Sequence, residues 1–161
     1  MSTADPNVLL IGVGNEYRSD DGAGLYAARA IREKHLPDLV VKEESGEGAA
    51  LMDAWDGFAR VVVVDAVSSG AVPGTIHRLD AGVQSVPSKF FHYSTHAFSV
   101  AEAVELARTI GRLPESLVLF GIEGETYIAG SHLSRPVADA LPGLIDRIVF
   151  ELVPSSEKKN G

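Results

Sequence analysis

The stretch "RVVVVDAV", residues 60–67, gives the strongest indication of the fold. Its four consecutive valines are too apolar for a strand with one face in water, and β-branched residues favour strands over helices. Such a run is typical of a central parallel strand that helices cover on both faces. Asp65 directly follows the valines. The strand is therefore expected to carry a carboxylate near its end, where α/β proteins build their sites.

The segments around this strand alternate between strand and helix patterns. Further strands are expected over residues 8–13, 39–44, 75–79 and 116–123, with 75–79 a candidate for an antiparallel edge. Helices are expected over about 20–35, 49–55, 96–109 and 134–152. This alternation predicts an α/β fold: a three-layer sandwich with a mainly parallel five-stranded sheet between helices. Residues 1–153 are expected to form one domain, and 154–161 a disordered tail.

Composition and charge restrict the class of protein. With 161 residues, of which 45% are hydrophobic and 22% charged, the chain suits one globular domain. The net charge of −8 argues against nucleic-acid binding. The absence of cysteine excludes disulfides, thiolate metal sites and a cysteine nucleophile, and is compatible with a reducing cytoplasm. Because the first apolar run breaks at Gly12, we expect neither a signal peptide nor a membrane span, and a cytoplasmic protein.

The stretch "GVGNEYRSDDGAG", residues 12–24, places two adjacent carboxylates after a glycine turn. Its glycine spacing differs from the dinucleotide fingerprint, and a pyrophosphate would need bare N–H groups where Asp20 and Asp21 stand. Ser19 and Asp20 are candidates to cap the helix that follows. A purely structural role for both aspartates, as cap and helix-dipole partner, is the alternative to a functional one.

Three residues are candidates for the chemistry: Asp21, Asp65 and His96. Each stands at a junction before a helix or after a strand, on the same predicted edge of the sheet. Two carboxylates and one imidazole suit Ni²⁺, Zn²⁺ or a similar divalent ion. The alternatives are that Asp65 caps a turn or pairs with a loop N–H, and that His96 is a surface or packing residue, with His92 its nearest rival.

Four segments together resemble those of one known family. They are "GVGNEYRSDDGAG", "VVVVDAV" with the following "VPGT", "STHAF" and "GIEGETYIAGSHLSRPVADALPGLIDRIV". In these segments the chain resembles the maturation endopeptidases of nickel–iron hydrogenases, almost from end to end. Members of that family have a twisted, mostly parallel sheet between helices. They remove a short C-terminal extension from the hydrogenase large-subunit precursor once nickel has been inserted.

The resemblance implies that Asp21, Asp65 and His96 are the metal-contacting and catalytic residues. It implies that Asp20 is the cap that orients the turn, whereas Glu16 occupies a variable position. The implied metal is nickel carried by the substrate, for which other divalent ions can substitute. The implied partner is the large-subunit precursor, and we expect a monomer that binds neither nucleic acid nor membrane. An acidic–aromatic pair at 16–17 and "SGEGAAL" at 45–51 depart from the common pattern, which concerns partner choice more than chemistry.

The sequence lacks the motifs of the familiar proteases. There is no H-E-x-x-H helix, G-x-S-x-G elbow or cysteine. The resemblance implies instead a metal-dependent, aspartic-type endopeptidase in which the substrate's nickel polarises the scissile carbonyl or activates a water, and a carboxylate serves as base. A non-proteolytic chaperone or carrier that senses the metal is the alternative. A peptidyl-transfer-RNA or nucleoside hydrolase of similar architecture is a weaker one, since fold alone does not fix function.

Overall fold

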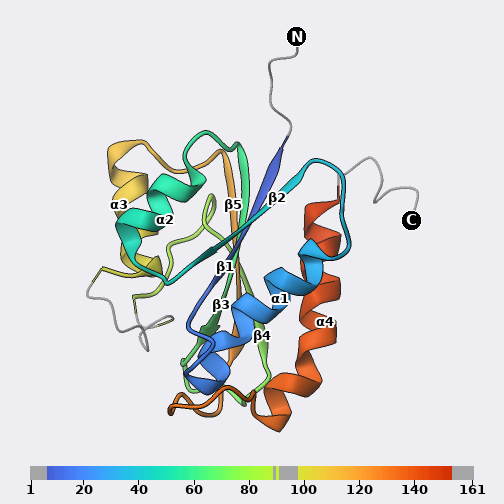
Figure 1. Ribbon diagram of the computed structural model, residues 1–161. Coiled ribbons are helices and arrows are strands. Elements are labelled where there is room, and N and C mark those ends of the chain that lie inside the picture. The colour runs from blue at the N-terminus through green and yellow to red at the C-terminus, as the bar shows by residue number, and fades with distance from the viewer. Residues whose placement is uncertain (1–6, 89, 91–97, 154–161) are drawn as a thin grey trace.

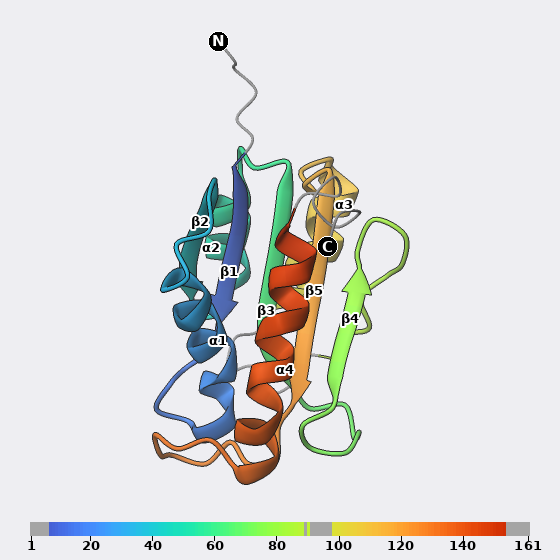
Figure 2. The same ribbon diagram turned by 90° about the vertical axis from the view of Figure 1, so that its right-hand side faces the viewer.

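A five-stranded sheet forms the centre of the protein, in a computed structural model that describes residues 7–88, 90 and 98–153 (Figure 1). The strands follow the order β2-β1-β3-β5-β4. Their bounds are β1 Val8–Val13, β2 Leu39–Glu44, β3 Arg60–Val67, β4 Ile76–Asp80 and β5 Ser116–Glu123. Four strands pair in parallel, and β4 pairs antiparallel to β5 at one edge (Figure 2). The mainly parallel sheet and its antiparallel edge are confirmed.

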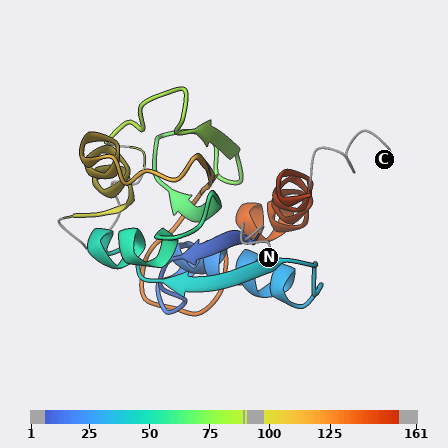
Figure 3. The same cartoon turned by 90° about the horizontal axis from the view of Figure 1, so that it is seen from above.

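Helices cover both faces of this sheet, which confirms the three layers. Their bounds are α1 Ala23–Arg32, α2 Gly48–Trp55, α3 Val100–Ile110 and α4 Arg135–Leu152. Seen along the strands, α1 and α4 lie on one face, and α2 and α3 on the other (Figure 3). Alternate valines of β3 enter the two cores: Val61 and Val63 pack with α2 and α3, and Val62 and Val64 with α1 and α4. In the described part of the chain, no helix combines the length and hydropathy needed to cross a membrane.

The start of the first helix differs from the prediction. A 3-10 turn, η1 (Ser19–Gly22), precedes α1, whose N-cap is Gly22 without any side-chain cap. The prediction that Ser19 and Asp20 cap this helix is therefore wrong. The third helix has its N-cap at Ser99, with a capping box to Glu102, and residues 91–97 lie outside the described part. The predicted disordered tail, 154–161, also lies outside it.

The strand order creates a switch point between β1 and β3. The chain passes from β1 outward to β2, and from β3 outward on the other side to β4 and β5. In open α/β sheets, ligands bind beyond the carboxyl ends of the strands at such a point. Gly24 brings α1 close to this place, because a Cβ there would lie 2.5 Å from the carbonyl oxygens of Val13 and Val64. The turn before α1 is thereby held at the switch point.

Candidate functional site

Asp65 lies at the switch point, just beyond the end of the β1–β3 ladder. The ladder ends with Gly12 opposite Val64, so Asp65 is the next residue of β3. Its side chain is buried, with 8% of the residue exposed. One carboxylate oxygen, Oδ1, accepts a hydrogen bond of 2.8 Å from the backbone N–H of Ala66. Among the described residues this is the one donor to the Asp65 carboxylate, and a single neighbouring donor is little compensation for burying a charged group.

The electrostatics of Asp65 favour a proton or a cation. Burial raises the pKa of Asp65 well above its ordinary value, and the nearby charge of Asp21 raises this pKa further. The hydrogen bond from Ala66 lowers the pKa, but it is the smallest of the three effects. Two carboxylates that repel one another at a buried position are stabilised by a cation that neutralises both. The pair is therefore a candidate position for a divalent ion.

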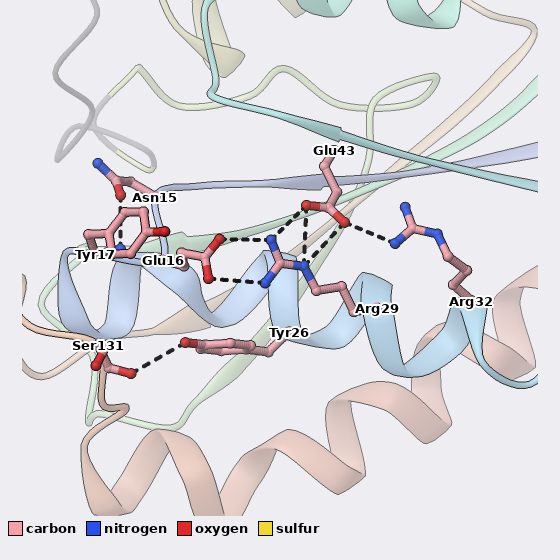
Figure 4. A network of polar contacts seen from close by, with 8 residues as sticks. All are labelled: Asn15, Glu16, Tyr17, Tyr26, Arg29, Arg32, Glu43 and Ser131. Carbon is pink, nitrogen blue, oxygen red and sulfur yellow. Dashed lines mark hydrogen bonds and ion pairs between the residues drawn. The ribbon is translucent and has the colours of Figure 1, made fainter.

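Asp21 belongs to a turn that closes on itself. Its Oδ2 accepts from the backbone N–H of Asn15 at 3.1 Å, and the same N–H lies 3.3 Å from the backbone oxygen of Asp21. The Asn15 side chain accepts from the N–H of Tyr17 at 2.9 Å (Figure 4). Gly14 is required here, because its φ is +146° and a Cβ would lie 1.9 Å from the Asp21 oxygen. The turn fixes Asp21, which stays partly exposed, at the carboxyl end of β1.

Asp20 has a different role from its neighbour. It is fully buried, and its carboxylate accepts from the backbone N–H groups of Glu125, Thr126 and Ser134 at 2.7, 3.1 and 2.7 Å. The Ser134 hydroxyl donates a further bond of 2.8 Å. Ser134 is the N-cap residue of α4. Asp20 thus orients the turn by joining it to the loop after β5, which runs beside η1 in Figures 1 and 2.

Glu16 is part of an ion-pair network rather than of the carboxylate pair. The Arg29 guanidinium contacts Glu16 at 2.9 Å and Glu43 at 2.8 Å, and Arg32 contacts Glu43 at 2.9 Å (Figure 4). The hydrogen bonds from Arg29 lower the pKa of both carboxyl groups. The network gives Glu16 a structural role, because it ties the turn at 15–17 to α1 and β2.

The structure brings two of the three predicted site residues together. Asp21 and Asp65 are close enough for the charge of one to shift the pKa of the other. His96 and its rival His92 lie outside the described residues. Within the described ranges, no three histidine, aspartate or glutamate side chains converge as a metal cluster. The assignment of His96 stays a prediction from the resemblance.

A second buried carboxylate, Glu123, was not singled out from the sequence. It accepts from the backbone N–H and hydroxyl of Ser69 at 2.7 and 2.6 Å, and from Gly70 N–H at 3.2 Å. A ring nitrogen of His77 lies 3.1 Å from it. Glu123 ends the apolar strand "SLVLFGIE", much as Asp65 follows its valines, and this similar position in the sequence could have marked it as a candidate site residue. It holds the loop after β3 against the end of β5.

The buried Tyr127 adds a further contact at this edge. Its hydroxyl donates to the backbone oxygen of Val67. Burial raises the pKa of Tyr127, and the charge of Glu123 adds to this effect, so the hydroxyl stays protonated as a donor. Gly124 leaves room for it, because a Cβ there would lie 2.4 Å from the Tyr127 oxygen. Nothing in the sequence pattern had indicated this residue.

Comparison with known proteins gives consistent matches. The sequence matches the family model described as hydrogenase maturation protease, HycI, over residues 37–151. It is 30% identical over 156 residues to the hydrogenase expression/formation protein HupM of Azotobacter chroococcum mcd 1, covering 93% of this chain and 74% of that protein. It is 29% identical over 150 residues to HupD of Bradyrhizobium diazoefficiens, covering 90% of this chain and 77% of that protein.

Solved structures share the fold. The [NiFe] hydrogenase maturation protease HybD from Thermococcus kodakarensis superposes with a TM-score of 0.67 at 25% identity, covering 91% of this chain and 99% of that one. The hydrogenase maturating endopeptidase HybD from E. coli gives a TM-score of 0.73 at 17% identity, covering 94% and 99%. At the lower identity the likeness is one of fold alone.

Proposed function

The chain belongs to the hydrogenase maturation protease family, and from this premise we propose that it removes the C-terminal extension of a nickel–iron hydrogenase large-subunit precursor after nickel insertion. Membership of the family makes it a peptidase. The observation that carries the finer proposal is the carboxylate pair at the switch point. Asp65 is buried next to the charge of Asp21, and its raised pKa marks a position that favours a cation.

In this proposal the substrate's nickel binds to Asp21 and Asp65, with His96 as the third ligand. When bound there, the ion supplies Lewis-acid chemistry that polarises the scissile carbonyl. The chain's own residues bind the ion and orient the carboxylates. The Asn15 N–H fixes the Asp21 carboxylate, and Asp65 releases its proton when a positive charge approaches. One of the two carboxylates then accepts a proton from the attacking water.

The test is the intact mass of a purified large-subunit precursor after incubation with this protein. We expect loss of a single C-terminal peptide from nickel-loaded precursor and no change in nickel-free precursor. Asp21→Asn and Asp65→Asn should abolish the loss, whereas Asp53→Asn, an exposed aspartate on α2, should leave it unchanged. A stable complex whose mass stays unchanged would favour the metal-sensing chaperone instead. Cleavage by Asp21→Asn at the wild-type rate would refute the assigned roles.

A further inference from the structure

Two large apolar side chains stand exposed beside the candidate site. Tyr17 and Ile128 are each 70% exposed. They come from segments far apart in the sequence that pair through a bridge between Arg18 and Gly130. The N–H of Gly130 donates to the oxygen of Tyr17 at 2.9 Å, and the Ser19 hydroxyl donates to the oxygen of Ile128 at 2.7 Å. A single exposed apolar residue is ordinary, whereas two on paired segments beside a site suggest a contact surface.

The backbone beneath these two side chains is held in place. Asp20, three residues after Tyr17, binds the N–H groups of Glu125 and Thr126, which precede Ile128. On the other side, the ion pair between Glu16 and Arg29 fixes the residue before Tyr17 (Figure 4). Side chains on an ordered backbone lose less conformational entropy on binding, so they make effective anchors.

A pocket of about 330 Å³ adjoins Tyr17 and carries excess negative charge. Its lining includes Asn15, Tyr17, Arg29 and the three carboxylates Glu16, Glu43 and Glu44. Arg29 pairs with the first two carboxylates. The Glu44 carboxylate forms neither a hydrogen bond nor an ion pair with any other described residue. Burial raises its pKa, and the nearby charge of Lys42 offsets only part of this effect. A cationic side chain entering the pocket would neutralise Glu44.

We propose that Tyr17, Ile128 and this pocket form one docking surface for an extended segment of the protein substrate. Apolar side chains of the segment pack on Tyr17 and Ile128, and one basic side chain enters the pocket beside Glu44. Charge favours this occupant over a second copy of the chain, because the net charge of −8 would bring like charges together. The inference rests on the proposed function for the identity of the partner. The chemistry of the surface requires that this partner carry apolar side chains and one basic side chain.

The experiment compares surface variants on nickel-loaded large-subunit precursor. The variants are Tyr17→Ser, Ile128→Ser, the double variant and Glu44→Gln. Matched controls are Phe150→Ser and Val83→Ser, which remove apolar side chains that are 62% and 80% exposed elsewhere on the protein. Both KM and kcat of cleavage are measured, and the dissociation constant is measured separately by calorimetry. Thermal melts check that each variant is folded.

We expect the double variant to raise KM and the dissociation constant by about tenfold or more, with kcat within about twofold of wild type. Glu44→Gln should weaken binding and reduce its dependence on salt. If wild type cleaves and the double variant behaves like the controls, the docking surface is refuted and the proposed function stands. If wild type binds without cleaving and the double variant loses binding, the surface stands and the proteolytic function fails. A wild-type dimer that the double variant dissociates, or no binding by wild type, would overturn the surface.

Discussion

Replacing Asp20 by alanine tests whether the contacts of this buried carboxylate hold the turn beneath the candidate site; we call these contacts the Asp20 anchor. The substitution removes a buried carboxylate that accepts four hydrogen bonds, three from backbone N–H groups and one from the Ser134 hydroxyl. The hydroxyl can turn to another acceptor, but the N–H groups of Glu125, Thr126 and Ser134 are fixed by the backbone. Alanine offers them no acceptor, and each loses a short bond to a charged group.

The expected loss of stability follows from these contacts. A hydrogen bond to a charged group contributes about 1.5–3 kcal/mol, and the contributions of one network do not add fully. We expect Asp20→Ala to lower the free energy of unfolding by on the order of 3–5 kcal/mol, a large share of the stability of a typical domain. Asp20→Asn should cost about 1–3 kcal/mol, because its amide nitrogen must face at least one N–H donor.

Denaturant unfolding measures both losses, with Asp139→Ala as the control. Asp139 is exposed on α4 and pairs with Arg135 only at the surface, so its loss should change stability by less than about 1 kcal/mol. Amide hydrogen exchange adds a local readout, since the amides of Glu125 and Thr126 should lose protection first. If Asp20→Ala unfolds within about 1 kcal/mol of wild type and keeps that protection, the assigned anchor is wrong.

Three further substitutions test the site and its packing. Asp65→Asn should raise the melting temperature more at alkaline than at acidic pH. The pKa of Asp65 is raised in the folded state, so its carboxyl group destabilises the fold as pH rises through that pKa. Thermal melts across a pH series measure the effect, and an equal shift at every pH would contradict it. Gly24→Ala should lower the free energy of unfolding, measured with denaturant, by about 1–3 kcal/mol, because the new Cβ would lie 2.5 Å from two backbone oxygens of the strands. Gly143→Ala is the control: it adds a Cβ in open space on α4 and should not lower the stability. Arg29→Ala should destabilise the protein at neutral pH but not in acid. The pKa values of its partners Glu16 and Glu43 are lowered, so the stability from these ion pairs disappears as pH falls through those values. Denaturant unfolding across a pH series measures this, and a loss of stability that persists in acid would indicate lost packing instead.

The strands were predictable because their signals are local. The apolar runs at 8–13 and 60–67 became β1 and β3 with the expected bounds, and the less apolar strand at 75–79 became the antiparallel edge as Ile76–Asp80. The short-range pattern around Asp20 was equally visible, yet its interpretation as a helix cap was wrong. Its partners lie 105–114 residues away, and no local pattern specifies a contact at that distance.

The candidate site was predictable only in part. Asp65 and Asp21 could be placed at one edge of the sheet because Asp65 lies near the end of one apolar strand and Asp21 follows another, in an alternating pattern of strands and helices. That they adjoin depends on β1 and β3 being neighbours, and single strands carry no signal of their order. Glu123 went unnoticed because its partners, Ser69 and His77, belong to a loop and an edge strand whose polar residues look solvated in sequence.

The Asp20 anchor also sets when the protein can become competent during its synthesis. The turn that carries Asp21 emerges from the ribosome early, but the groups that hold it, Glu125, Thr126 and Ser134, emerge more than a hundred residues later. At the usual rate of about 5–20 residues per second, the delay amounts to about 5–20 seconds. Until Glu125 emerges, the carboxylate of Asp20 has none of these partners. A nascent chain shorter than 125 residues therefore has the acidic turn without its support, and the set of partners is complete only once residue 134 has emerged.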